Sequence, residues 1–489
     1  MNRTKALVVL AVLLAATSPV AAEDVGMLLE LDERANRPAE PAVPREDLRQ
    51  VPTANLLFSM TAPDNAVCIR GVDDVTADGR PEIMVGIDES GVPNVFCLDG
   101  SSQGTASVVW SHQTTTGVSG GAPYGDQSVE VGPDADGNGF ANVLVGTAWG
   151  GRTAYSFDSF DGTVHWKFDT YLEPESGWVY SVTGLNDVTG DGVPDAAFGA
   201  GSFNDTLYVV DGSSSGGLGS QATVVWSSYV GDAVYGVRDI GDVNGDGKHD
   251  VLAAIGDNVD VLACYSGGSS PPTGDLLWSY TPGLSLYACG VLPDVTGDGV
   301  DEALAVLWTA NGSAIRCRNG VNGAEVWSST SVFDYGMMVD ALDDVTGDGK
   351  AEVVVSSWEN AVSVLSGADG SQVWKTWVGS LNGGDVWTAR AIDDLDGDGY
   401  QDVVAGSFDT YVYAMSGVDG SIIWSFPTGN RVYSVASVGD LDFDGVPEVG
   451  VATQDTTSST VVYVLGWNPP LFADDFETGT TDAWSFVMP

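Results

Sequence analysis

The sequence predicts an all-β protein, an eight-bladed β-propeller with four-stranded blades. Three observations support this fold. A nine-residue acidic loop recurs eight times, and successive copies begin 46 to 60 residues apart. Seven short strand-like segments carry a tryptophan near their middle. The eighth such segment lies at the start of the chain, before the first loop. Units of about 50 residues are typical of propellers and repeat arrays.

Each acidic loop places oxygen-bearing side chains at its positions 1, 3, 5 and 9 and glycine at position 6; residues 394–402 (DLDGDGYQD) are the clearest copy. Alternate residues of a tight loop can converge on one point, and glycine permits the sharp reversal. Ca²⁺ takes six to eight oxygen ligands at roughly 2.3–2.6 Å. We therefore expect up to eight calcium sites, the second being doubtful because two of its four positions are asparagine.

The expected ligands are Asp74, Thr76, Asp78 and Glu82; Asp134, Asp136, Asn138 and Asn142; Asp187, Thr189, Asp191 and Asp195; Asp242, Asn244, Asp246 and Asp250; Asp294, Thr296, Asp298 and Glu302; Asp344, Thr346, Asp348 and Glu352; Asp394, Asp396, Asp398 and Asp402; Asp440, Asp442, Asp444 and Glu448. Solvated turns also use Asp, Asn and Gly, but eight copies in one register favour metal loops. An EF-hand is disfavoured because position 12 is apolar, as at Val85 and Val355, where that loop needs glutamate.

The tryptophan segments predict how the ring closes. They are centred on Trp110, Trp166, Trp226, Trp278, Trp327, Trp374 and Trp424. Phe58 precedes Asp74 by 16 residues, the same spacing that separates Trp226 from Asp242. We therefore expect residues 54–60 to complete the last blade, whose other strands lie at the C-terminus. A propeller closed in this way leaves no sheet edge unpaired, whereas seven blades would leave one acidic loop without a blade.

The innermost strand of each unit carries its own pattern. The residue seven positions before the first aspartate of the loop is aromatic in five units: Tyr180, Tyr235, Tyr287, Trp387 and Tyr433. In a propeller these side chains would form a collar at one level near the axis. One interpretation is packing between blades. The other is a stacking platform for a sugar or peptide at one mouth of the channel.

The chain ends outside the repeats carry different signals. Arg3 and Lys5 followed by the apolar run 6–16 and small residues at 20–22 predict a signal peptide over residues 1–22. Residues 23–53 read as a linker rich in proline and charge, residues 54–466 as the propeller, and residues 467–489 as a C-terminal extension. We expect a secreted, periplasmic or cell-surface protein with no membrane span after cleavage of the signal.

The net charge is −50, and 25 of the 68 acidic residues occupy the expected ligand positions of the eight loops. This charge argues against a nucleic-acid partner, whose phosphates require Lys and Arg. The five cysteines form no Cys-x-x-Cys pair and most simply act as small buried residues.

With these residues in view, the chain resembles FG-GAP/VCBS repeat proteins, through the pattern D-x-[DNT]-x-[DN]-G-x-x-[DEN] in all eight loops. The resemblance implies Ca²⁺ bound between two strands of each blade. Residues 367–374 (GADGSQVW) and 417–424 (GVDGSIIW) also resemble PQQ-type propeller repeats, in which the tryptophan docks one blade against the next. A quinone-dependent dehydrogenase is disfavoured because the chain has no vicinal cysteine pair.

The motifs favour a monomeric binding, adhesion or scaffold protein with structural calcium and a protein or glycan ligand. The alternative is a carbohydrate-binding propeller or a polysaccharide-active, lyase-like enzyme at the channel mouth. Such an enzyme needs a basic or tyrosine cluster, for which Arg238 and Arg390 are the basic candidates. The sequence contains no nucleophile motif, phosphate loop or zinc-protease motif, so catalysis is left open.

Overall fold

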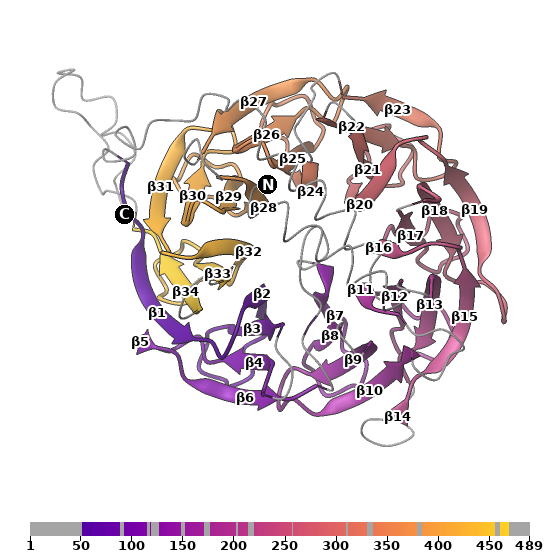
Figure 1. Ribbon diagram of the computed structural model, residues 1–489, viewed down its shortest axis with the longest axis horizontal. Coiled ribbons are helices and arrows are strands. Elements are labelled where there is room, and N and C mark those ends of the chain that lie inside the picture. The colour runs from indigo at the N-terminus through magenta and orange to yellow at the C-terminus, as the bar shows by residue number, and fades with distance from the viewer. Residues whose placement is uncertain are drawn as a thin grey trace, which may run out of the picture.

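A computed structural model shows eight four-stranded sheets arranged in a ring, as Figure 1 shows. It describes residues 51–468 except 89–91, 115–117, 119–126, 148–151, 171–176, 202–203, 214–219, 257, 310–311, 330–335, 379–383 and 455–459. The predicted signal peptide, most of the predicted linker and residues 469–489 lie outside the described residues. The described residues contain no α-helix, and therefore no helix that could cross a membrane. The predicted all-β, eight-bladed fold is confirmed.

Blade 1 contains β2 (Ala66–Val72), β3 (Glu82–Ile87), β4 (Val95–Leu98) and β6 (Val108–His112). Blade 2 contains β7 (Val129–Gly132), β8 (Asn142–Gly146), β9 (Thr153–Asp158) and β10 (Val164–Asp169). Blade 3 contains β11 (Val179–Gly184), β12 (Ala196–Ala200), β13 (Thr206–Asp211) and β15 (Thr223–Tyr229). Blade 4 contains β16 (Val234–Asp239), β17 (Val251–Ile255), β18 (Val261–Ser266) and β19 (Asp275–Tyr280).

Blade 5 contains β20 (Ser285–Leu292), β21 (Glu302–Thr309), β22 (Gly312–Arg318) and β23 (Glu325–Ser328). Blade 6 contains β24 (Gly336–Leu342), β25 (Glu352–Ser357), β26 (Ala361–Leu365) and β27 (Gln372–Trp377). Blade 7 contains β28 (Val386–Ile392), β29 (Asp402–Ser407), β30 (Tyr411–Met415) and β31 (Ile422–Pro427). Blade 8 contains β32 (Arg431–Ser437), β33 (Val449–Gln454), β34 (Val461–Gly466) and β1 (Asn55–Thr61). The two-residue strands β5 (Gly104–Thr105) and β14 (Ser220–Gln221) extend the sheets of blades 8 and 2.

The first strand of the chain closes the ring. In Figure 1, β1 lies beside β34, and the two strands pair antiparallel with Phe58 opposite Val464. In β1 the pairing skips Leu57, a β-bulge immediately before Phe58. The other outer strands carry the same bulge immediately before their tryptophan, as in β31, where Trp424 lies opposite Ala414. The shared register confirms that Phe58 occupies the tryptophan position of blade 8.

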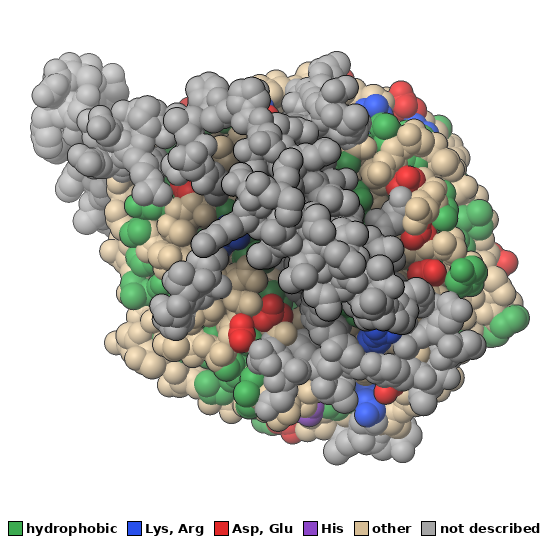
Figure 2. Space-filling view, in the orientation of Figure 1, with side chains coloured by type: hydrophobic (Ala, Val, Ile, Leu, Met, Phe, Trp, Pro, Cys, Tyr) green, Lys and Arg blue, Asp and Glu red, His purple; other side chains and the backbone are tan. Residues whose placement is uncertain are grey.

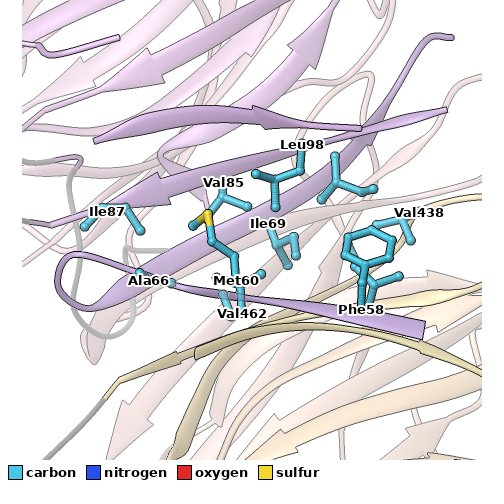
Figure 3. Close-up of a cluster of buried hydrophobic side chains, with 14 of the residues drawn as sticks. Phe58, Met60, Ala66, Ile69, Val85, Ile87, Leu98, Val438 and Val462 are labelled. Atoms are coloured by element: carbon cyan, nitrogen blue, oxygen red, sulfur yellow. The ribbon is translucent and has the colours of Figure 1, made fainter. Parts of the chain in front are cut away.

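The hydrophobic core is divided among the blade interfaces. Figure 3 shows the cluster between blades 8 and 1, where Phe58, Met60 and Val462 meet Ile69 and residues of β3 and β4. Comparable clusters of Val, Leu, Ile and Trp lie between the other neighbouring blades. Face-to-face packing of sheets therefore buries both surfaces of each blade, which explains strands such as β25 that are apolar at nearly every position.

Inner strands β2, β7, β11, β16, β20, β24, β28 and β32 contact one another in sequence around the axis, and β32 returns to β2. In seven of the eight, the pairing with the next strand skips one residue, seven positions before the first aspartate of the following loop. These unpaired residues are Val67, Tyr180, Tyr235, Tyr287, Met337, Trp387 and Tyr433. All five aromatic residues of the predicted collar are therefore bulge residues, and a bulge re-aims the side chain it carries.

All five cysteines are buried, as expected for small core residues. Asp and Glu side chains are spread over the face shown in Figure 2, in keeping with the net charge of −50.

Candidate metal sites and aromatic collar

Each acidic loop connects the first strand of a blade to the second, for example β24 to β25 through residues 344–352. Glycine at position 6 adopts φ between +85° and +95° in all eight loops. This left-handed conformation is open to glycine and costly for other residues. The loops and the collar lie at opposite ends of the inner strands, because the collar residues begin those strands and the loops follow them.

Three hydrogen bonds recur in all eight loops. The aspartate at position 1 accepts the N–H of position 6, the residue at position 5 accepts the N–H of position 7, and the residue at position 9 accepts the N–H of position 2. A carboxylate has further lone pairs for an ion. The loop is therefore shaped by its own side chains.

The aspartate at position 1 is partly buried, and it accepts backbone N–H groups of its own loop. Asp294 accepts the N–H groups of Gly297 at 2.6 Å and Gly299 at 2.7 Å. Slight burial opposes ionisation of Asp294, but these N–H donors outweigh it and lower the pKa of Asp294 below its usual value. The pKa values of Asp134 and Asp187 are lowered in the same way. In these three loops the carboxylate at position 1 is thus kept ionised and can ligate a cation.

Position 9 is buried at the base of the loop. Glu352 is fully buried, and it accepts the Val345 N–H at 2.9 Å and the Thr346 hydroxyl at 2.8 Å. Burial raises the pKa of the position 9 carboxyl groups, to about 7 for Asp402 and about 8 for Glu448. A buried carboxylate without an opposing charge is costly, and a cation in the loop would remove that cost.

Five of the eight loops bring three carboxylates together, with one oxygen of each within 4.8 Å of the others. The five groups are Asp74, Asp78 and Glu82; Asp294, Asp298 and Glu302; Asp344, Asp348 and Glu352; Asp394, Asp396 and Asp402; and Asp440, Asp442 and Glu448. Two ligands of one Ca²⁺ lie at most about 5 Å apart, because each Ca–O distance is at most about 2.6 Å. These groups can therefore hold one hard cation each.

The third carboxylate of each group depends on position 3. Where position 3 is threonine, the group uses the aspartate at position 5, and the hydroxyls of Thr76 and Thr346 donate to the buried glutamate instead. Where position 3 is aspartate, as in loops 7 and 8, Asp396 or Asp442 completes the group. In loops 1 and 6 the threonine at position 3 therefore supports position 9 and supplies no carboxylate of its own.

The eighth loop gives the most direct test of fit. Oδ1 of Asp440 and Oε1 of Glu448 are buried and have no hydrogen-bond partner among the described residues. Both belong to the same carboxylate group. Buried acceptors are normally satisfied, and two unsatisfied oxygens on carboxylates of one such group are what a bound cation would contact. The donor set, all oxygen and anionic, fits Ca²⁺.

Loops 2, 3 and 4 do not bring three carboxylates together among the described residues. In loop 2, Asn138 donates to Asp158, and Asn142 donates to the Phe157 carbonyl. In loops 3 and 4 the aspartate at position 9 is one methylene shorter than glutamate. Asp195 turns one oxygen to the Gly212 N–H at 2.8 Å, and Asp250 does the same with Gly267 at 3.1 Å. Position 3 in these loops, Thr189 or Asn244, offers no carboxylate within reach.

Position 4 of the loop is a constraint that the sequence reasoning missed. It has positive φ in every copy, between +60° and +85°. Six copies have glycine there, whereas Ala77 and Phe443 adopt this conformation with a side chain. The glycine at position 4 in six of the eight copies could have indicated this positive φ from the sequence alone.

The tryptophans dock one blade against the next, as the resemblance implied. The Nε1–H groups of Trp278, Trp327 and Trp374 donate to the carbonyls of Gly320, Gly367 and Gly417 at 2.6–2.7 Å. Trp226 bonds Gly267 and Trp110 bonds Ser159 in the same way. At the interface of blades 2 and 3, the His165 ring nitrogen meets the Gly212 carbonyl at 2.8 Å.

These glycines also contact the acidic loops, a link that the sequence does not reveal. A Cβ on Gly320, Gly367 or Gly417 would lie within about 2 Å of the carbonyl at position 8 of the loop in its own blade. Glycine is therefore required for the close approach. The Gly417 N–H also donates to Asp402 at 3.0 Å. The metal loop of a blade is thus in direct contact with the residue that receives the tryptophan of the preceding blade.

The predicted collar forms part of a longer aromatic arc. Tyr180, Tyr235 and Tyr287 contact in turn, with ring centroids 5.1 and 5.5 Å apart. The arc continues through rings at the ends of second strands and returns to the collar: Trp308, Trp358, Trp387, Phe408 and Tyr433. Sequence reasoning missed Trp308, Trp358 and Phe408, because the bulges and strand ends that bring them to the collar are not visible in the repeat pattern.

The basic candidates lie elsewhere. Arg238 and Arg390 both stand four residues before a loop, so each is three residues further along its inner strand than the collar residue. The Arg390 guanidinium lies 3.9 Å from Asp340 of the neighbouring inner strand. Arg431 lies beside the arc, with its guanidinium carbon 4.9 Å from the Phe408 ring centroid.

Comparisons with known proteins agree with this architecture. A family model described as FG-GAP-like repeat matches residues 344–405 and 394–451, which include loops 6, 7 and 8. A comparison with curated protein sequences gave no match.

Solved structures share the fold at low sequence identity. Sqt1 of Saccharomyces cerevisiae has a TM-score of 0.61 and 13% identity, with 85% of this chain and 100% of that chain covered. A quinohemoprotein alcohol dehydrogenase of Comamonas testosteroni has a TM-score of 0.54 and 12% identity, with 86% of this chain and 78% of that chain covered. BamB of Moraxella catarrhalis has a TM-score of 0.52 and 15% identity, with 85% of this chain and 100% of that chain covered. Such similarity shows the fold alone. The chain carries FG-GAP-like repeats on an eight-bladed β-propeller.

Proposed function

We propose that this protein is an exported, calcium-stabilised propeller that binds a ligand at the mouth bearing the aromatic arc. The observation that carries the calcium assignment is the recurrence of a three-carboxylate group at the same place in five blades. Carboxylates held this close to one another repel unless a cation joins them. The FG-GAP-like match over loops 6 to 8 supports the same reading. Calcium is structural in this proposal, and it joins the first and second strands of a blade.

Thermal unfolding tests the calcium assignment. At 100-fold excess over Kd, each bound ion contributes about 2.7 kcal/mol, so five sites contribute roughly 13 kcal/mol. Unfolding entropy scales with chain length at about 2.1 cal/mol/K per residue, which converts this to a Tm shift of roughly 10–15 °C for a propeller of this size. We expect that loss when EGTA replaces CaCl₂, and recovery with Ca²⁺ in preference to Mg²⁺. An identical melting curve in both buffers would reject the assignment.

The chemistry of the arc favours a glycan, and an acidic one in particular. Tyr180, Tyr235, Trp308 and Trp358 are buried between blades, whereas Tyr287, Trp387, Phe408 and Tyr433 are partly exposed. The partly exposed rings can stack on sugar rings, and Arg431 adds an exposed cation beside Phe408 and Tyr433. Burial raises the pKa of Tyr433 to about 12, with the Arg431 charge opposing the shift. A tyrosine with so high a pKa is a poor general base at neutral pH. The arc therefore supports binding more strongly than the lyase-like alternative.

An array of acidic and neutral oligosaccharides, probed with the calcium-loaded protein, tests this part. We expect acidic members to bind and Arg431→Gln to weaken that binding at least fivefold. Arg80→Gln is the matched control, because Arg80 lies in loop 1 at the opposite end of the inner strand β2. Equal effects of the two variants, or binding restricted to a protein partner, would reject a glycan ligand. Release of unsaturated products from the acidic members would establish the lyase instead.

A further inference from the structure

The junction between blades 8 and 1 lacks the hydrogen bond found at five other junctions. Here the outer strand carries Phe58 where those junctions carry tryptophan. Gly100 is the position equivalent to Gly320, Gly367 and Gly417. Each of these glycines follows by three residues the third-strand residue that lies opposite the tryptophan of its own blade. A Cβ on Gly100 would lie 2.0 Å from the Pro81 carbonyl, as in those other blades. Gly100 therefore has the same conformation, but the phenyl ring of Phe58 has no N–H to offer its carbonyl.

A pocket of about 450 Å³ lies at this junction. Its walls include Leu57, Gly100, Gln103 and, from the metal loops on either side, Arg80 and Leu441. The pocket is large enough for an aromatic side chain, since small-ligand sites begin at about 300 Å³. Two leucines supply the apolar part of the wall, and the rest of the wall is polar, with Arg80, Ser101, Ser102, Gln103 and Asp442. The Gly100 carbonyl supplies an acceptor that no described donor reaches. This combination matches an indole, apolar with one N–H at its edge.

The C-terminal segment, residues 469–489, is the part of this chain placed to supply that indole. It follows β34, and a Cβ on Gly466 of that strand would lie 2.5 Å from Leu57 in the pocket wall. Trp484 is the one tryptophan after Trp467. An extended chain of 16 residues, the interval from Asn468 to Trp484, reaches roughly 50 Å, so distance is not limiting. Residues 1–50 contain no Phe, Tyr or Trp, so the N-terminal segment offers no competing ring.

We propose that Trp484 docks in this pocket and donates its indole N–H to the Gly100 carbonyl. The C-terminal segment then supplies at the closing junction the contact that Trp226, Trp278, Trp327 and Trp374 supply elsewhere in the ring. The joint between β1 and β34 holds the two ends of the propeller together, so an indole inserted beside Leu57 would reinforce the junction at which the ring must open.

Fluorine NMR of the full chain labelled with 5-fluorotryptophan tests this proposal. Trp484→Phe identifies the resonance of residue 484. We expect that resonance to be displaced from free 5-fluorotryptophan, with a solvent isotope shift between H₂O and D₂O at least twofold smaller than that of the free amino acid. Gln103→Phe fills the pocket from an exposed position and is expected to return the resonance to the free values. Gln372→Phe, at an exposed position on the outer strand of blade 6, is the matched control and should leave it displaced.

Three results would overturn the proposal. A Trp484 resonance at the free position shows an undocked segment. A displaced resonance that ignores Gln103→Phe shows docking elsewhere. Displacement that is lost on dilution shows that the pocket receives the segment of a second copy.

Discussion

Replacing Trp278 and Trp424 separately by phenylalanine measures the energy of one hydrogen bond between blades. Both indoles lie at the same position of an outer strand and in the same kind of core cluster. Trp278 donates to the Gly320 carbonyl at 2.6 Å, whereas Nε1 of Trp424 is buried without a partner among the described residues. The difference arises because the acceptor position in blade 8 is Trp467, while it is glycine in blade 5.

The two substitutions remove the same atoms. Their polar contributions to the free energy of unfolding should have opposite signs. Trp278→Phe leaves the Gly320 carbonyl buried and unpaired, which costs about 1–3 kcal/mol. Trp424→Phe removes a donor that was already unsatisfied and recovers a similar amount. Apolar burial acts in the opposite direction, because Trp424 is 0% exposed and Trp278 is 7% exposed. If apolar area decided the outcome, Trp424→Phe would therefore be the more damaging change.

We expect Trp278→Phe to destabilise the protein by about 2 kcal/mol more than Trp424→Phe. Urea unfolding of the calcium-loaded protein, followed by far-UV circular dichroism, gives the two differences in the free energy of unfolding as the shift in midpoint multiplied by the common slope. The reasoning is refuted if Trp424→Phe costs as much as Trp278→Phe or more.

The other predictions concern the loops. In EGTA, stability should fall as pH rises from 5 to 8, because the raised pKa values of Asp402 (about 7) and Glu448 (about 8) favour the folded state only while these groups are protonated; melting curves across that range in EGTA and in CaCl₂ check this, and a parallel decline in both buffers would contradict it. Calcium titration by calorimetry should give a stoichiometry nearer five than eight, and Glu352→Gln should remove one site; eight equivalent sites would show that Asn142, Asp195 and Asp250 also ligate. Gly399→Ala should cost about 1–2 kcal/mol although a Cβ there has open space, because its φ is +92°. Ala77→Gly, at φ +60°, should stabilise by about 0.5–1 kcal/mol; urea midpoints distinguish both from the reverse outcome.

The repeat pattern was sufficient to predict the fold, because it combined two landmarks with a fixed offset. The loops alone did not say where a blade begins. The 16-residue offset between Phe58 and Asp74 did, because it assigned a strand at residues 54–60 to the last blade. The structure confirms that assignment down to the bulge at Leu57.

The sites were less predictable, because they depend on reach and direction that a pattern does not record. Asp195 and Asp402 hold the same position in the pattern, but Asp402 belongs to a carboxylate group and Asp195 does not. The identity of position 3 decides this, because it is Thr189 in loop 3 and Asp396 in loop 7. The aromatic arc was partly missed for a similar reason, since Trp308 and Trp358 lie in different registers from the collar and meet it only through packing of second strands against inner strands.

Position 9 of the loop connects the proposed calcium sites to the cohesion of the ring. In blades 3, 4 and 7 this residue is aspartate, and its shorter side chain receives the N–H of the glycine that caps the next hairpin. In blade 7 a continuous path then runs from Trp374 of blade 6 through Gly417 to Asp402. Asp402 also lies in a carboxylate group. In blades 1, 5, 6 and 8 the longer glutamate turns toward the other carboxylates of its loop instead. Aspartate at position 9 thus stabilises the blade interface directly through a hydrogen bond, whereas glutamate at this position depends on a cation to hold its loop. In blade 7, Asp402 makes the hydrogen bond and also belongs to a carboxylate group. Chelation should accordingly loosen the blades with glutamate loops before blades 3 and 4, an order that hydrogen exchange of β3, β12, β17 and β25 resolves.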